Sequence, residues 1–160
     1  MVIINKIHFF VSLVLLFGMV LSLLPMPEIL VSCKPPIVLL ILIYWSLAHP
    51  KYINLSYAFI TGLIMDILLV TPLGYHSLCF TITIYLILIY YPQIRVQSNS
   101  TKMLSLLVIL IPYFLTSTIV NNILEIEYNI IDVVLSILIS IIIWPAMFNM
   151  LRFVRQKYTS

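Results

Sequence analysis

The sequence predicts an all-α integral membrane protein, a single-domain compact bundle of about six transmembrane helices. Two observations carry this prediction. First, 63% of the 160 residues are hydrophobic and 8% are charged, whereas soluble domains have about 45–50% apolar and about 25% charged residues. Second, the apolar residues form six stretches, and six spans of about 20 residues use most of the chain. A soluble enzyme, a disordered chain and a nucleic-acid-binding protein are therefore excluded.

Prolines and polar clusters separate the six stretches, which is where a missing backbone N–H costs least. The first stretch is expected to be a retained helix rather than a signal peptide, because it is long for one and no small-residue cleavage site follows Leu24. The expected spans cover about residues 7–24, 35–48, 53–70, 73–91, 103–124 and 130–151.

The second stretch is unusually short. Its apolar part, 37–48, gives a helix of roughly 18 Å, against a hydrocarbon thickness of roughly 30 Å. It fits a buried core helix, a re-entrant segment, or a short span that begins at Pro35 and Pro36. The charge distribution favours the short span.

Positive charges indicate the orientation. With six spans and both termini in the cytoplasm, seven of the eight Lys and Arg residues lie inside and only Lys34 lies outside, as the positive-inside rule requires. The outer loop before the last span then carries Glu125, Glu127 and Asp132. The inside residues are Lys6, Lys51, Arg95, Lys102, Arg152, Arg155 and Lys157.

Aromatic residues gather near the predicted cytoplasmic ends of the spans, where Tyr and Trp commonly form an interfacial belt. They are Tyr44, Trp45, Tyr90, Tyr91 and Trp144. Tyr44 and Trp45 could instead anchor a partner.

Two prolines fall inside predicted spans. Pro112 and Pro145 are expected to kink or interrupt their helices, which membrane helices tolerate where neighbours satisfy the freed carbonyl.

Asp66 is the only acidic residue inside an apolar run. An ionisable group in a membrane span is costly and is a functional candidate by default. Ala58, Gly62 and Asp66 follow one another at intervals of four, so they share one helix face, and the first two form a small-xxx-small pair that lets another helix approach closely. Asp66 is expected to be either a helix-packing anchor or a wetted residue at the membrane boundary. A proton relay is disfavoured because no ionisable partner is evident.

Gly74 follows the connection at Thr71-Pro72, and in a chain with three glycines it is expected to serve a turn or a close approach. His76 is interpreted as an interfacial histidine. The scattered His and Cys residues predict no metal and no disulfide framework, although a bond between Cys33 and Cys79 stays open.

The ordered landmarks along the chain resemble the MreD family of rod shape-determining proteins, of the proteobacterial kind. Each motif is unspecific alone, but their order and spacing extend over nearly the whole chain. The motifs are Pro25-Met26-Pro27, Lys34-Pro35-Pro36, the apolar run ending in Tyr44-Trp45, His49-Pro50, Gly62-x-x-x-Asp66, Leu73-Gly74, Trp144-Pro145, Arg152 and Arg155-Gln156.

The resemblance implies a multi-pass protein of the bacterial inner membrane that belongs to the cell-elongation complex. The implied partners are MreC, the actin-like MreB, the glycosyltransferase RodA and its class B penicillin-binding protein, with membrane lipid and no nucleic acid. It implies no catalytic activity, no cofactor, and a fold similar to the substrate-binding component of energy-coupling-factor vitamin transporters. The family's matching positions are carried over as packing or partner positions only: Pro35, Tyr44, Trp45, Pro50, Gly62, Asp66, Leu73 and Gly74.

The sequence leaves one rival function, a vitamin-type transporter component, which needs polar groups converging on a cavity. The interior offers little beyond Asp66, Thr81, Thr83 and the run Thr116-Ser117-Thr118. That run is modest support for a transporter, although hydroxyls in helices often bond their own backbone. An intramembrane enzyme is disfavoured because no nucleophile lies beside a base.

Overall fold

The computed structural model describes residues 2–25, 34–96, 99–125 and 129–159, with side chains over 7–25, 34–94, 108–125 and 129–157. Met26, Pro27, Cys33 and Glu127 lie outside the described residues, and so do the side chains of Lys6, Arg95 and Lys102. The described residues form six helices, α1 (Val2–Leu23), α3 (Ile37–Ala48), α4 (Leu55–Leu69), α5 (Tyr75–Val96), α6 (Asn99–Ile123) and α7 (Ile130–Thr159).

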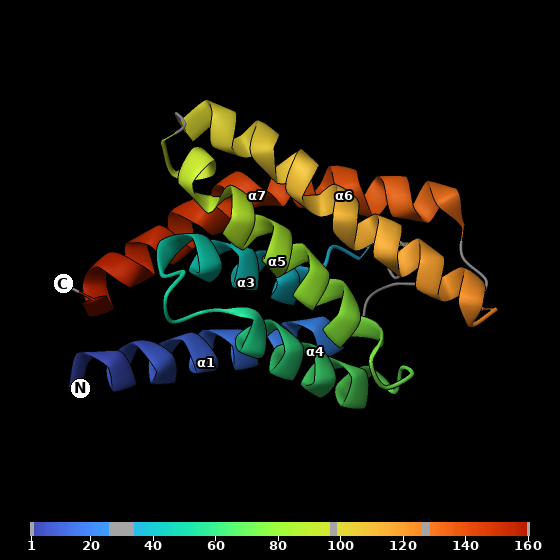
Figure 1. Cartoon of the computed structure of the whole chain (residues 1–160), viewed down its shortest axis with the longest axis horizontal. Helices are drawn as coiled ribbons and strands as arrows, with labels where there is room; N and C mark the ends of the chain where they lie inside the picture. The colour runs from blue at the N-terminus through green and yellow to red at the C-terminus, as the bar shows by residue number, and fades with distance from the viewer. Residues whose placement is uncertain (1, 26–33, 97–98, 126–128, 160) are drawn as a thin grey trace.

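The helices run back and forth along the length of the molecule (Figure 1). Both termini and the turn from α3 to α4 lie at one end, which we call the terminal end, and the turns from α4 to α5 and from α6 to α7 lie at the opposite end. Helix is the expected state for so apolar a chain, because in lipid every backbone polar group needs a partner within the segment. Each of the six expected spans overlaps one of these helices, and α1, α5, α6 and α7 extend beyond the expected bounds.

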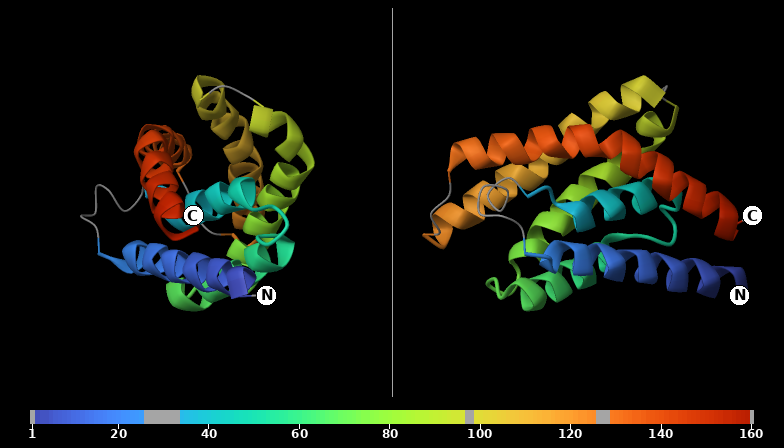
Figure 2. Two further views of the ribbon diagram at one scale, coloured as in Figure 1. Left: turned by 90° about the vertical axis from the view of Figure 1, so that its left-hand side faces the viewer. Right: turned by 180° about the vertical axis from the view of Figure 1, so that it is seen from behind.

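Helix α3 lies in the middle of the bundle, between α1, α5 and α7 (Figure 2, left). Every side chain from Val38 to Ser46 is buried. A helix that is apolar on all sides is stable only when it is surrounded. The segment is therefore enclosed by the other helices of the bundle.

The interfacial belt predicted from Tyr44, Trp45 and Trp144 is wrong. Their side chains are only 2%, 0% and 4% exposed. Tyr44 and Trp45 belong to the enclosed helix α3, and the Trp144 ring packs against Phe148 on the same helix, α7. Burial among other helices removes them from the interface, whereas Tyr90 is 53% exposed.

Prolines stand inside three of the helices, at Pro92, Pro112 and Pro145. The fourth span was expected to end at Pro92, yet α5 continues to Val96. Near Pro112 the Thr116 hydroxyl donates to the carbonyls of Pro112 and Tyr113, at 2.7 and 2.9 Å. These are the usual bonds of a helical hydroxyl to a carbonyl one turn earlier, and the carbonyl that the missing Pro112 N–H leaves free is that of Val108.

Two segments of the described chain are long and apolar enough to cross a membrane, Tyr75–Ile94 and Ile130–Lys157. The shorter apolar segments are Ile7–Leu23, Ile37–Ala48, Leu55–Leu69 and Val108–Ile123.

Candidate functional site at the turn between α4 and α5

The turn between α4 and α5 is built around the C-terminal residues of α4. The helix ends at Val70, whose φ of 54° is left-handed, and the Thr71 N–H donates to the Asp66 carbonyl at 3.0 Å. Gly74 has a φ of +102°, which L side chains rarely adopt. The chain therefore reverses within a few residues and begins α5 at Tyr75.

The Asp66 carboxylate accepts hydrogen bonds from this turn and from the first residues of α5. The Gly74 N–H donates to Oδ2 at 2.9 Å, and the His76 N–H donates to Oδ1 at 2.8 Å. His76 Nδ1 lies 2.8 Å from the same Oδ1, and the Thr71 hydroxyl donates to it at 3.1 Å. Asp66 thus caps the N-terminus of α5 from the preceding helix, where the dipole favours a negative charge.

Burial decides between the two interpretations of Asp66. The residue is 1% exposed, so the interpretation as a wetted boundary residue is wrong. A buried carboxylate is tolerated only when it is paired and hydrogen-bonded, and the bonds from Gly74, His76 and Thr71 meet this condition. His76 is 9% exposed, and its ring lies against the Asp66 carboxylate.

The face that carries Asp66 also packs directly against α5. Ala58 is 0% exposed, and a Cβ added to Gly62 would lie 2.2 Å from the Ser77 Cα. Only glycine fits where two backbones approach this closely. Ala58, Gly62 and Asp66 therefore form one packing surface, which we call the α4 small face.

The turn also exposes apolar side chains. Leu73 is 75% exposed and Val70 is 91% exposed. Both project from a turn that the Asp66 bonds hold in place. Among the candidate residues, Leu73 is the one whose side chain is available to a partner.

A second group of candidates lies toward the terminal end. The Tyr44 ring packs edge-on to Phe148, and the Arg155 guanidinium carbon lies 5.9 Å from the Tyr44 ring centroid. These contacts join α3 to α7. The structure therefore separates the candidates into two groups, one at the α4–α5 turn and one around Tyr44, Trp45, Trp144 and Pro145.

His49 and the half-buried Pro50 form the turn after α3. The His49 carbonyl accepts from the Tyr52 and Ile53 N–H groups, both at 3.0 Å, and its ring stacks on Trp45. Burial lowers the pKa of His49 below its ordinary value, and the nearby Arg155 charge lowers it further.

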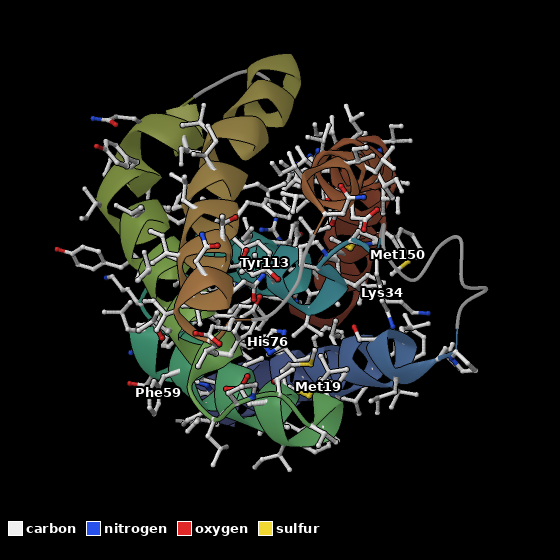
Figure 3. All side chains as sticks on the ribbon, turned by 90° about the vertical axis from the view of Figure 1, so that its right-hand side faces the viewer. Met19, Lys34, Phe59, His76, Tyr113 and Met150 are labelled. Atoms are coloured by element: carbon white, nitrogen blue, oxygen red, sulfur yellow. The ribbon has the colours of Figure 1, made fainter. Side chains whose placement is uncertain are left out.

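A small cavity lies beside His76 at the end opposite the termini (Figure 3). It measures about 130 Å³ and includes the buried Pro35. The cation in its lining is Lys34. The Lys34 ammonium donates to the Ser22 carbonyl in the last turn of α1, and the Ser136 hydroxyl donates to the Lys34 carbonyl at 2.9 Å. A cation there satisfies the exposed carbonyls of a helix C-terminus.

Most of the hydroxyls that a transporter could use bond their own helices, whereas the buried Thr81 hydroxyl has no hydrogen-bond partner. Thr83 donates to the Cys79 carbonyl at 2.7 Å, and Ser117 and Thr118 donate to the Phe114 carbonyl at 3.0 and 2.8 Å. Cys79 is buried and unbonded to another cysteine. Over the described ranges, no three His, Cys, Asp or Glu side chains gather as a metal site would require.

Sequence reasoning missed the partners of Asp66. The partners follow Asp66 by five, eight and ten residues, at Thr71, Gly74 and His76. The chain reversal at Thr71-Pro72, which the sequence did indicate, brings them back beside Asp66. It also missed the contact between His8 and Tyr57, whose Nδ1 and hydroxyl lie 2.6 Å apart. No local pattern could reveal that pair, because the two residues lie on α1 and α4.

Comparison with known proteins identifies the family. The family model described as rod shape-determining protein MreD matches residues 4–154. The chain belongs to the MreD family. It is similar to the curated "Rod shape-determining protein MreD" of Haemophilus influenzae, with 31% identity over 140 residues that cover 86% of this chain and 85% of the relative. No solved structure gives a significant match.

The resemblance seen in the motifs is therefore confirmed. MreD proteins are membrane proteins of the machinery that determines rod shape, and they are structural proteins rather than enzymes. At the candidate site α4 packs against α5, and in a family of structural proteins no reaction needs to be assigned to Asp66 or His76.

Proposed function

We propose that this chain is a non-catalytic, multi-pass subunit of the inner-membrane cell-elongation complex. In this proposal all six helices cross the membrane, both termini are cytoplasmic, and the bundle is like the substrate-binding component of energy-coupling-factor transporters. The subunit binds MreC and helps to organise lateral peptidoglycan synthesis, together with MreB, RodA and a class B penicillin-binding protein.

The main support is family membership over residues 4–154. The state of the polar interior agrees with it. The Asp66 carboxylate is occupied by the turn and α5, and Thr83, Ser117 and Thr118 bond their own helices. The engagement of this carboxylate and these hydroxyls within the chain suits a subunit that associates through its surface.

The transporter alternative has less support. The family model and the curated relative are both described as rod shape-determining proteins and not as transport components.

Co-purification tests this proposal. A tagged chain is solubilised from cells in mild detergent, and the eluate is probed for MreC and for small molecules by mass spectrometry. MreC in stoichiometric amount is the expected result. A tightly held vitamin-like molecule without MreC would overturn the scaffold function and favour the transporter.

Leu73 is the residue at which we place direct partner contact. We expect Leu73→Ser to reduce the MreC recovered several-fold without changing the amount of this chain. The control is Phe153→Ser, a comparably exposed apolar residue on α7, at 68% against 75%. Equal loss of MreC in both variants would remove Leu73 from the interface.

A further inference from the structure

A groove lies on the flank of the bundle between α1 and α4, away from the α4–α5 turn. It has a volume of about 540 Å³, within the range of small-molecule sites. Its walls are the face of α1 from His8 to Met19 and the face of α4 from Ser56 to Ile64. The twelve residues from His8 to Met19 are separated by eleven helical steps and span roughly 16 Å, about half of the roughly 30 Å hydrocarbon thickness.

The lining changes character along the groove. Toward the terminal end it is polar, with His8, Tyr52, Asn54, Ser56 and Tyr57. The His8 ring stacks on Tyr57 and meets Tyr52 edge-on, so the aromatic groups there are held in place.

The rest of the groove is mostly apolar, with Ser12 and Thr61 as its polar residues. Leu16 and Ile60 are each 57% exposed and Ile64 is 38% exposed, while Leu15 and Met19 form the buried floor. A polar mouth followed by an apolar trough of one leaflet's depth matches the shape and polarity of a membrane lipid.

The polar mouth also carries positive potential. It lies at the N-terminus of α4, where Asn54 caps the Ser56 N–H at 3.2 Å, and the exposed Lys51 stands three residues earlier. A helix N-terminus and a nearby ammonium both favour a phosphate group.

We propose that this groove binds one anionic glycerophospholipid of the leaflet at the terminal end. An acyl chain lies in the trough along Leu16, Ile60 and Ile64, and the phosphate lies at the start of α4 beside Lys51. A partner helix fits the groove less well, because a helix about 10 Å across would rest over it rather than fill it. The proposal rests on the membrane residence of MreD proteins and not on MreC binding.

Native mass spectrometry tests the site on the whole chain. The tagged protein is reconstituted in vesicles of phosphatidylethanolamine and phosphatidylglycerol, extracted into mild detergent, and weighed with its retained lipid. We expect one phosphatidylglycerol bound per wild-type chain. Ile60→Trp, whose side chain fills the trough, should reduce the amount of bound lipid at least tenfold. The control is Ile67→Trp, a residue on the same helix that is 67% exposed and outside the groove. Equal retention in the two variants, or no retention by the wild type, would overturn the site.

The charge at the mouth gives a second readout. Lys51→Gln should lower the preference for phosphatidylglycerol over phosphatidylcholine by roughly fivefold, the effect of one lysine near a lipid surface. An unchanged preference would contradict the placement of the phosphate.

A measurement on the unmodified chain guards against misfolding of the variants. Phosphatidylglycerol with a photoreactive diazirine on its acyl chain is cross-linked in vesicles, and the adducts are mapped on peptides. Adducts should concentrate on α1 and α4 around Leu16 and Ile60, relative to the equally apolar and more exposed Ile142 on α7, at 75%. Adducts that follow exposure alone would indicate bulk lipid and reject a specific site. MreC co-purification is scored separately, so failure here leaves the proposed function intact.

Discussion

Asp66 acts through hydrogen bonds to backbone N–H groups of a different helix. Its carboxylate holds Gly74 and His76 at 2.9 and 2.8 Å, and its own carbonyl accepts from Thr71 at 3.0 Å. One residue therefore ends α4, shapes the turn and begins α5. This explains why an acid is tolerated at a position that is 1% exposed.

Replacing Asp66 should destabilise the protein. Asp66→Leu leaves the Gly74 and His76 N–H groups without their acceptor. Each unsatisfied buried donor costs about 1–3 kcal/mol, so we expect a loss of about 2–6 kcal/mol. Asp66→Asn keeps one carbonyl oxygen and should lose less. The thermal unfolding midpoint of the solubilised protein, its cellular level and rescue of rod shape in cells lacking MreD measure the effect.

Asp132→Leu is the matched control for this prediction, because Asp132 is a half-buried acid in the first turn of α7. Normal rods and normal protein levels with Asp66→Leu would remove the reason for singling out Asp66.

The lowered pKa of His49 predicts that the stability of the protein depends on pH. Because burial holds its folded pKa below the ordinary value, the unfolded chain binds more protons as the pH falls through about 6.5. Stability should therefore decrease on acidification through this range. Unfolding midpoints at pH 7.5 and pH 5.5 should differ more for the wild type than for His49→Gln. The same decrease in both would show that other groups carry the acid sensitivity.

At the scale of elements, α4 and α5 form the most extensive helix pair of the bundle. The α4 small face permits this approach, because the Gly62 position meets the backbone of Ser77 and not a movable side chain. Ala58 and Gly62 thus allow close packing along the length of the pair, and the hydrogen bonds of Asp66 join the two helices at the turn between them.

Gly62→Ala should force the pair apart. An added methyl would meet the Ser77 Cα at 2.2 Å, and overpacking against a fixed neighbour costs roughly 1–3 kcal/mol or more. Gly18→Ala is the control, since its nearest contact is the flexible Ile41 Cδ1, which can turn aside. Unfolding midpoints should fall clearly for Gly62→Ala and little for Gly18→Ala. Equal midpoints would mean that the crossing relaxes easily.

The elements differ in how well the sequence predicted them. Periodicity alone placed Ala58, Gly62 and Asp66 on one helix face, because spacing by four depends only on helix geometry. It could not place Tyr44 and Trp45, because their burial depends on which helices surround α3. The apolar character of α3 on all sides could have predicted this burial, because such a helix is stable only when other helices surround it.

At the scale of the whole molecule, proline and charge positions predicted the number of helices in the described chain and their approximate order. They could not reveal the groove between α1 and α4, because its two walls meet only after the bundle has folded. The family motifs supplied the function that composition could not, since apolar spans are common to many membrane proteins.

Reporter fusions test the orientation proposed for the whole bundle. Alkaline phosphatase fused after Gln97 should stay inactive, because the positive-inside rule places that connection in the cytoplasm. The same reporter fused after Glu125, in the turn that follows α6, should be active. Activity at the first site or inactivity at the second would contradict the six-span arrangement.

The contacts of Asp66 also bear on how the chain enters the membrane during synthesis. Its four bonding groups come from residues no more than ten positions later. The costly carboxylate is therefore satisfied within one helical hairpin, before α6 and α7 have been made. Insertion can proceed with α4 and α5 as a paired unit, and the rest of the bundle assembles on a hairpin whose only acid is already hydrogen-bonded by its neighbours.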